Sequence, residues 1–278
     1  DILAMGLSYQ TFKPSPALSN WVSHYWVTET SFNPEKLTPA QTCLPMGLVQ
    51  WVIQTRGKHQ LGLIDNQWGA FPDDFLVGLM NRPVRWKMFG ESRAFGICIS
   101  PEWFTYIYNF PLSSISDSFI SVDNLDIPGL PSLRESLVLE EDDLAKQIEL
   151  IDQFLLALLE QQQAAENFFA STIQKIRLQK GSFDKETLRD YFFLGDRQIQ
   201  RLFKTNFGLS PKAYERVTRF SNTIRYMNRY ARPEWDVIAD ELGYSDQAHL
   251  IREFKAYAGF TPSNSYLNNS TVLFVPAE

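Results

Sequence analysis

The chain has 278 residues, 44% of them hydrophobic and 21% charged, which excludes a disordered protein and suggests about two domains with packed cores. Its net charge of −6 argues, by itself, against a polyanionic partner. Two cysteines are too few for a disulfide framework, which favours a reducing compartment.

No segment has the pattern of a signal peptide or a membrane span. The first residues, DILAMGLSYQ, lack a basic start followed by an apolar stretch. The longest apolar segment, IDQFLLALLE (151–160), is too short and too acidic to cross a bilayer. We therefore expect a cytoplasmic protein that has no membrane partner.

Residues 1–125 have the pattern of a β-rich domain. Short segments rich in apolar and aromatic residues alternate here with Gly, Pro, Asn and Asp, and six of the seven tryptophans lie in this part. This spacing predicts a small barrel or a jelly roll, followed by a short helix at PEWFTYIYNF (101–110). The predicted strands are GLVQWVIQT (47–55), DFLVGLM (74–80), VRWKMFG (84–90) and FGICIS (95–100).

Residues 126–166 change to a helical pattern. Five apolar residues spaced by 4, 3, 4 and 3 positions predict one helix face: Leu144, Ile148, Ile151, Leu155 and Leu158. The face covers only about two heptads, which leaves two interpretations open. The helix packs on the β domain, or it forms a dimer interface with a second copy of the chain. QQQAAEN (161–167) then has the composition of a linker.

The charge is divided unevenly along the chain. Residues 1–171 carry 10 basic against 20 acidic side chains, whereas residues 172–268 carry 16 basic against 11 acidic. The acidity therefore belongs to the first part of the chain, and a basic domain follows. We expect this domain at residues 167–270, with a short tail at 271–278.

An internal repeat lies in the basic domain. RLFKTNFGLSP (201–211) and REFKAYAGFTP (252–262) are identical at five of eleven positions without a gap. In each copy a glycine ends one helix, and Ser or Thr followed by Pro begins the next. A further short helix precedes each copy, at KETLRDYFF (185–193) and EWDVIADELG (234–243). The layout is a helix-turn-helix, present twice.

Helical geometry predicts which side chains of the second helix in each unit are free to contact DNA. In residues 196–206 an apolar ridge must be buried, which leaves Arg197, Gln200, Arg201 and Lys204 on the opposite side. In the second unit Gln247, Ala248, His249, Arg252 and Lys255 lie away from the buried Leu250 and Phe254. Arg and Gln form paired hydrogen bonds with guanine and adenine, and Ala contacts the thymine methyl group. We assign Lys204 and Lys255 to phosphates.

PKAYERVTRFSNTIRYMNRY (211–230) predicts one long helix between the two units. A helix of this length spans roughly 30 Å, close to the roughly 34 Å between successive major-groove segments on one side of B-DNA. One chain could thus place both recognition helices on the same side of a duplex. Its arginines are candidates for phosphate contact, Arg219 first and then Arg216, Arg225 and Arg229.

With these residues the basic domain resembles the DNA-binding domain of the AraC/XylS family of bacterial transcription regulators, through IQRLFKTNFGLSPKAY and IADELGYSDQAHLIREFKAYAGFTP. The resemblance implies seven helices. It also implies that seven residues take base-facing positions: Arg197, Gln200, Arg201, Gln247, Ala248, His249 and Arg252. Two departures concern the first unit, where Gly195 replaces a usual Ser and Arg189 a usual small residue.

Residues 1–125 resemble, more loosely, a β-rich domain of unknown function that precedes such regulators, through LPMGLVQWVI (44–53) and FGICISPEWFTYIYNFPLSSISD (95–117). This resemblance implies a cupin-like sensor domain that binds an effector or mediates dimerisation. The histidines, His24, His59 and His249, are far apart in the sequence and form no metal-ligand motif. We expect no metal and no cofactor.

The sequence therefore predicts a sequence-specific transcription regulator that binds double-stranded DNA as a homodimer. RNA polymerase and a small-molecule effector stay open as further partners. The alternative is an enzyme, either a sugar-active barrel or a DNA-alkylation repair protein fused to a DNA-binding domain. The repair enzyme needs a metal-bound reactive cysteine, and Cys43 and Cys98 lie in no such motif. A third interpretation makes the β domain an interaction module without a ligand.

Overall fold

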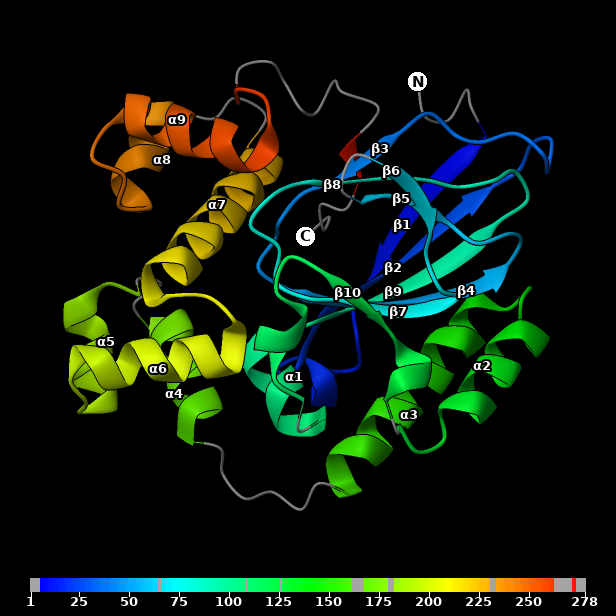
Figure 1. Ribbon diagram of the computed structural model, residues 1–278, viewed down its shortest axis with the longest axis horizontal. Coiled ribbons are helices and arrows are strands. Elements are labelled where there is room, and N and C mark those ends of the chain that lie inside the picture. Colours follow the sequence, from blue (N-terminus) through cyan, green and yellow to red (C-terminus); the bar gives the residue numbers. More distant parts are fainter. Residues whose placement is uncertain are drawn as a thin grey trace.

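The computed structural model describes the chain as a β-rich part followed by an all-helical part. The described residues are 6–64, 67–108, 110–125, 127–161, 168–179, 183–230, 234–262 and 272–273. The predicted linker at 161–167 therefore lies, beyond its first residue, outside the described residues. Figure 1 shows the helical part beside the sheets.

The β-rich part consists of two sheets. The larger has the spatial order β1 (Leu7–Phe12), β2 (Val22–Thr30), β9 (Arg93–Ile99), β4 (Val49–Arg56), β7 (Asp74–Val77) and β10 (Phe119–Ser121), all antiparallel. The smaller has the order β11 (Val272–Leu273), β3 (Gln41–Cys43), β8 (Val84–Lys87), β5 (Leu61–Ile64) and β6 (Gln67–Ala70). Among its described strands only β11 pairs in parallel, with β3, so residues 272–273 lie at the edge of this sheet.

The four predicted strands are confirmed as β4, β7, β8 and β9, and the two sheets account for their patterns. β9 lies inside the larger sheet and is buried along its whole length, which explains its continuous apolar sequence. The predicted barrel is corrected to an open pair of sheets, because the described strands of one sheet form no ladder with those of the other. Aromatic residues fill the space between the sheets, among them Trp26, Phe71, Phe75 and Trp86.

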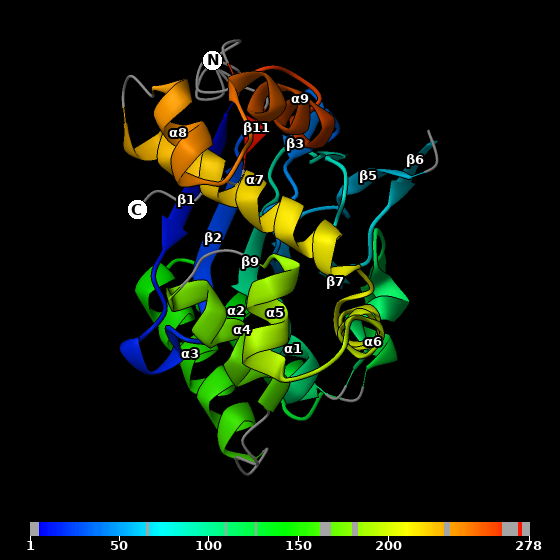
Figure 2. The ribbon, with the colours of Figure 1, turned by 90° about the vertical axis from the view of Figure 1, so that its left-hand side faces the viewer.

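Helices cover the outer face of the larger sheet (Figures 1 and 2). They are α1 (Pro101–Tyr108), α2 (Leu130–Leu139) and α3 (Leu144–Gln161), with three short 3-10 helices, η2 (Pro16–Leu18), η3 (Leu112–Ile115) and η4 (Val122–Asn124). α3 is fixed to the sheet by specific contacts. Asp152 accepts hydrogen bonds from the Tyr25 hydroxyl at 2.6 Å and from the Ser15 amide at 3.1 Å. The Phe154 ring meets Trp51 edge-on, with centroids 5.8 Å apart.

The apolar face of α3 packs within its own chain. Ile151, Leu155 and Leu158 are buried, and Leu144 and Ile148 are partly buried against the same core. This corresponds to the first of the two interpretations, a helix packed on the β domain. Ile151, Leu155 and Leu158 are therefore out of reach of a second copy, because the chain's own core covers them. A dimer contact through Leu144 and Ile148 stays a prediction.

The helical part contains α4 (Phe168–Gln179), α5 (Lys185–Phe192), α6 (Asp196–Phe207), α7 (Pro211–Arg229), α8 (Trp235–Glu241) and α9 (Gln247–Ala258). We call α5 and α6 the first unit and α8 and α9 the second unit. α7 joins them as one long helix, as predicted, and runs past the β domain (Figure 2). A seventh helix after Pro262 would lie outside the described residues.

The first unit and the β domain share one core. The Arg177 guanidinium of α4 donates to the Glu102 carboxylate of α1 at 2.9 Å and to the hydroxyl of Tyr214 on α7. The Thr105 hydroxyl donates to the Asn206 carbonyl at 3.1 Å. Only the C-terminal end of α6 takes part in this contact. In the part of the chain that the structure describes, no helix has both the length and the apolar character needed to span a membrane.

Candidate nucleic-acid interface

The recognition helix of the first unit, α6, has a glycine as the capping residue at each end. Gly195 is its N-cap, and the Gln198 side chain accepts a hydrogen bond from the Gly195 amide at 3.1 Å. Gly208 ends the helix with φ +70, a left-handed conformation that glycine adopts without steric cost. Ile199 and Phe203 are buried, which fixes the rotation of the helix about its axis.

This rotation exposes the predicted base-facing side chains. Arg197, Gln200 and Arg201 are all exposed, and neither arginine forms an ion pair with a carboxylate of the described residues. Lys204 is also exposed, and its amine donates to the Gly208 carbonyl at 2.8 Å. The structure thus brings the four side chains to one face of α6, with Arg197, Gln200 and Arg201 in its N-terminal half and Lys204 in its last turn.

Arg189, the unusual residue of the first unit, is held by an ion pair with the recognition helix. Its guanidinium forms two hydrogen bonds with Asp196 at 2.6 and 2.8 Å, and Asp196 is the first residue of α6. This pairing lowers the pKa of Asp196. Where the family has a small residue that packs closely, this chain joins α5 and α6 through a charged pair at the surface.

The recognition helix of the second unit, α9, begins at the N-cap Asp246, whose carboxylate accepts from the His249 amide at 2.6 Å. Leu250 and Phe254 are buried. Ala248, Arg252 and Lys255 are exposed, while Gln247 and His249 are half-buried. The His249 ring is held by its own unit, because its Nδ1 atom accepts from the Ser245 amide at 3.3 Å and the ring lies edge-on to Tyr244.

The assignment of Arg219 to a phosphate is corrected. Its side chain is only 14% exposed, and its guanidinium donates to Glu253 of α9 at 3.1 and 3.3 Å. Arg216 also donates to Glu253, at 3.0 Å. Glu253 is a buried partner of both arginines, and we did not predict it. The sequence contains a signal for it, since Glu253 follows Leu250 by three positions and precedes Tyr257 by four, on the apolar face of α9.

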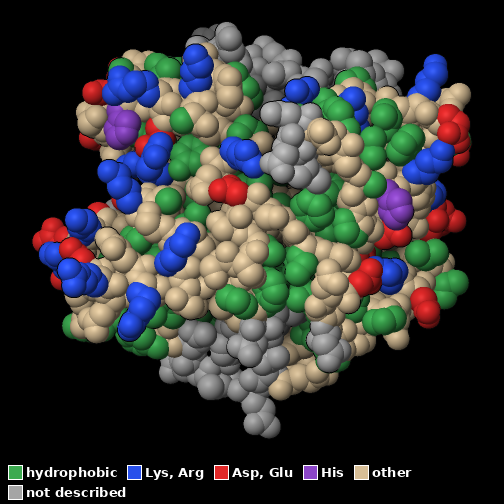
Figure 3. All heavy atoms as spheres, viewed as in Figure 1, with side chains coloured by type: hydrophobic (Ala, Val, Ile, Leu, Met, Phe, Trp, Pro, Cys, Tyr) green, Lys and Arg blue, Asp and Glu red, His purple; other side chains and the backbone are tan. Residues whose placement is uncertain are grey.

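The surface charge matches this arrangement. Figure 3 shows lysine and arginine side chains gathered over the helical part, where α5, α6 and α9 lie in Figure 1. The face of each recognition helix that carries arginine is therefore directed outward, away from the core of the chain. A cationic surface of this kind attracts a polyanion.

The two thiols are poor nucleophiles. Burial raises the pKa of Cys43 to about 11, opposed by the hydrogen bond from Gln50, and burial also raises the pKa of Cys98. The described residues contain no group of three or more His, Cys, Asp or Glu side chains that could hold a metal ion. This geometry offers no support for the repair-enzyme alternative, which needs a reactive thiolate.

Comparisons with known families divide the chain in the same way. Residues 10–121 match a domain of unknown function (DUF6597), and residues 188–265 match a helix-turn-helix domain. Among curated protein sequences, none matches this chain.

Several solved structures share parts of the architecture at low identity. ToxT from Vibrio cholerae O395 is 10% identical, with 93% of this chain and 96% of ToxT covered and a TM-score of 0.47. ToxT bound to (E)-4-(8-methylnaphthalen-1-yl)but-3-enoic acid is 12% identical, with 92% and 97% covered and a TM-score of 0.46. The AraC-like transcriptional activator CuxR is 13% identical, with 82% and 88% covered and a TM-score of 0.28.

Proposed function

We propose that this chain is a sequence-specific DNA-binding regulator of transcription. It carries a domain of unknown function at residues 10–121, followed by an AraC-type helix-turn-helix domain at residues 188–265. One observation carries the proposal. The two recognition helices of the repeat each bury an apolar ridge and expose an arginine-bearing face, as a helix that enters a major groove must.

Binding in this proposal involves no chemical step. Exposed cationic side chains such as Lys255 neutralise phosphates, which supplies much of the affinity and makes it dependent on salt. Arg197, Gln200 and Arg201 of α6 then contact base edges in one major-groove segment, and Arg252 with Ala248 does so in the next. All three polar base-facing side chains of α6 are exposed, whereas on α9 only Arg252 is, so we expect stronger base discrimination by the first unit.

Selection of preferred duplexes from a random pool, with the intact protein, tests the proposal. We expect an enriched motif made of two short segments, and an affinity that falls steeply as salt rises. A protein that binds no duplex more tightly than random DNA at any salt concentration would refute it. Detection of methyl transfer from alkylated DNA would favour the repair-enzyme alternative instead.

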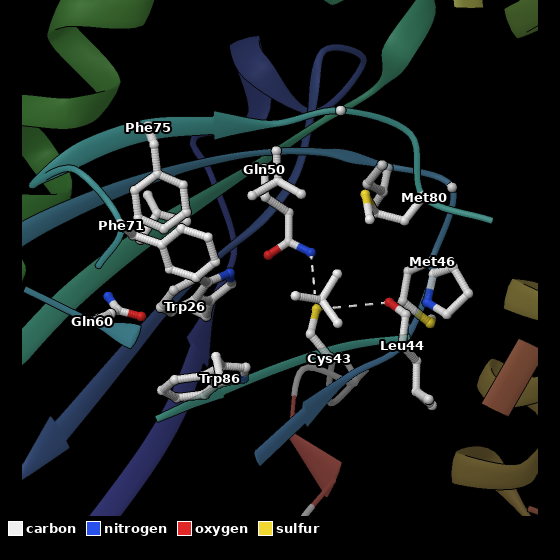
Figure 4. A pocket seen from close by; sticks show the side chains of 17 residues that line it. Trp26, Cys43, Leu44, Met46, Gln50, Gln60, Phe71, Phe75, Met80 and Trp86 are labelled. Atoms are coloured by element: carbon white, nitrogen blue, oxygen red, sulfur yellow. Dashed lines mark hydrogen bonds between the residues drawn. The ribbon is translucent and has the colours of Figure 1, made fainter. Parts of the chain in front are cut away.

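We further propose that the β domain holds a small effector between its two sheets. Figure 4 shows a cavity lined by Trp26, Phe71, Phe75, Met80 and Trp86, with Gln50 and Cys43 also in its lining and directed toward each other. No charged side chain occurs among the described residues that line it. The chemistry of this lining favours an uncharged, largely apolar ligand with one or two polar atoms.

The cavity is small, about 50 Å³. Apolar cavities of roughly 150 Å³ are needed to hold benzene, so an effector must displace part of the wall. The segment Leu44–Leu48 forms one wall and belongs to no helix or strand. It lies against α7, since a β-carbon placed on Gly47 would be 3.7 Å from Cγ1 of Val217. Movement of this wall would therefore act on the helix that joins the two DNA-binding units.

Tryptophan fluorescence against a panel of uncharged aromatic and aliphatic metabolites tests the effector proposal. Trp86→Phe should lose most of any response, whereas Trp235→Phe, in the second unit, should keep it. No response to any compound, together with a stable dimer by sedimentation, would favour the interaction-module interpretation. A homodimer stays part of the proposal, with an interface that does not include the buried Ile151, Leu155 and Leu158.

A further inference from the structure

Glu253 of α9 is a buried carboxylate that faces the linker helix. It is 5% exposed, although Arg252 and Lys255 on the same helix are both exposed. Its two oxygens accept hydrogen bonds from Arg216 Nε at 3.0 Å and Arg219 Nε at 3.1 Å, both on α7. We call these three residues the Glu253 cluster. His249 Nε2 approaches the same carboxylate at 3.5 Å.

Arg219 extends the Glu253 cluster to the turn of the second unit. Its NH1 atom donates to the Gly243 carbonyl at 3.0 Å, and its guanidinium lies 4.8 Å above the centre of the Tyr244 ring. The Tyr244 hydroxyl in turn contacts the Thr223 hydroxyl of α7 at 2.9 Å. Both the recognition helix and its turn are thus joined to α7 through directional polar contacts.

The described contacts of α6 with α7 are of a different kind. In the repeat the residue that aligns with Glu253 is Leu202, which is partly buried. α6 meets α7 through aromatic rings instead, with Phe207 stacked on Tyr214 at 4.5 Å and Phe203 edge-on to it at 5.6 Å. Apolar contacts tolerate small shifts, whereas a charged pair with two or more hydrogen bonds fixes the relative orientation of its partners.

Stability alone gives a weak reason for a buried ion pair, because replacing one by apolar residues of similar volume is often neutral or stabilising. A role in geometry is better supported here. We propose that Glu253 is a positioning residue that sets the angle of α9 on α7, and thereby the separation between the two DNA segments that the protein accepts. The inference rests on the proposed DNA-binding function and goes beyond it.

The same carboxylate has a second consequence. It pairs with Arg216 and Arg219, which the sequence makes candidates for phosphate contact. Removing it would free two cations on the linker helix. The salt dependence of DNA binding would then become steeper, by about one to two in the slope of log K against log salt. The salt slope thus reports the release of the two arginines, whereas the spacing preference reports the angle of α9.

The experiment compares wild-type protein, Glu253→Gln and Glu253→Leu on duplexes with zero to three base pairs inserted between the two selected segments. Asp240→Asn is the matched control, because it removes one exposed carboxylate from α8 of the same unit. Wild type and Asp240→Asn should lose about tenfold or more in affinity on insertion, since one helix loses its base contacts. Both Glu253 variants should lose about threefold or less and show the steeper salt slope.

Retention of the wild-type spacing preference and salt slope by both Glu253 variants would overturn the inference, while leaving the proposed function intact. Absence of any sequence preference in wild type would instead refute the proposed function. Circular dichroism checks that the variants are folded. Should neither fold, Arg219→Lys replaces them, because it keeps the charge but loses the paired hydrogen bonds; an unchanged spacing preference in that variant would equally overturn the inference.

Discussion

Phe193 has a backbone conformation that its side chain does not favour. It lies in the turn of the first unit with φ +54, and its ring is 86% exposed. The second unit has Gly243 in the corresponding turn, with φ +72. A left-handed conformation costs an L-residue about 1–2 kcal/mol. Phe193→Gly should therefore raise the free energy of unfolding by about 1 kcal/mol, part of the gain being offset by the flexibility of glycine in the unfolded chain. Urea denaturation measures it, and a loss of stability would show that the exposed ring packs after all.

Substitutions of Arg201 and Lys255 distinguish contact with bases from contact with phosphates. Both side chains are exposed, one on each recognition helix. Arg201→Ala should cost about 1–3 kcal/mol on the selected duplex and relax preference at one base pair only. Lys255→Ala should weaken all duplexes alike. Titration against duplexes substituted at each position measures both effects. A base-specific loss in the lysine variant would reverse the assignment.

At the scale of elements, local sequence patterns predicted individual helices and strands, whereas contacts between segments distant in the sequence determined how these elements are arranged. The repeat at 201–211 and 252–262 predicted both units and the exposed faces of α6 and α9, because capping and helical periodicity are local. Closure of a barrel depends on pairing between strands distant in sequence, so the local pattern could not distinguish a barrel from a jelly roll of two sheets. The ion pair between Glu253 and Arg219 was not predictable for the same reason. The two residues are 34 positions apart in the sequence, and the crossing of α9 on α7 brings them together.

A buried histidine on β2, close to an arginine of α7, predicts that the free energy of unfolding depends on pH. His24 of β2 is 6% exposed, and burial together with Arg225 of α7 lowers its pKa from 6.5 to about 4. Above about pH 6.5 the histidine is neutral in both the folded and the unfolded chain, so it does not change the free energy of unfolding with pH. As pH falls from there to about 4, only the unfolded chain gains the proton, so stability decreases by about 3 kcal/mol.

The difference between wild type and His24→Gln isolates this contribution from other titrating groups. Urea denaturation of both proteins at pH 7 and pH 4.5 should show the wild type losing more stability than the variant on acidification. Equal losses in the two proteins would mean that His24 is protonated without difficulty in the folded state.

At the scale of the whole molecule, the buried Glu102 joins the β domain to the helical part through Arg177. Arg177→Ala would leave this carboxylate unpaired in the core, which should cost about 3–5 kcal/mol of unfolding free energy. The double variant Glu102→Gln with Arg177→Met should cost clearly less, because no charge stays buried. Denaturation followed by tryptophan fluorescence and by circular dichroism measures both. Equal costs for the single and double variants would contradict a role for the charge itself.

The central claim is that one chain places α6 and α9 in successive major-groove segments on one side of a duplex. Methylation interference on a selected duplex, with wild type, Arg201→Ala and Arg252→Ala, tests it most directly. The account predicts two contacted segments whose centres lie about 10 base pairs apart. Arg201→Ala should remove contacts in one segment and Arg252→Ala in the other. A single contacted segment, or two segments that both variants weaken equally, would contradict it.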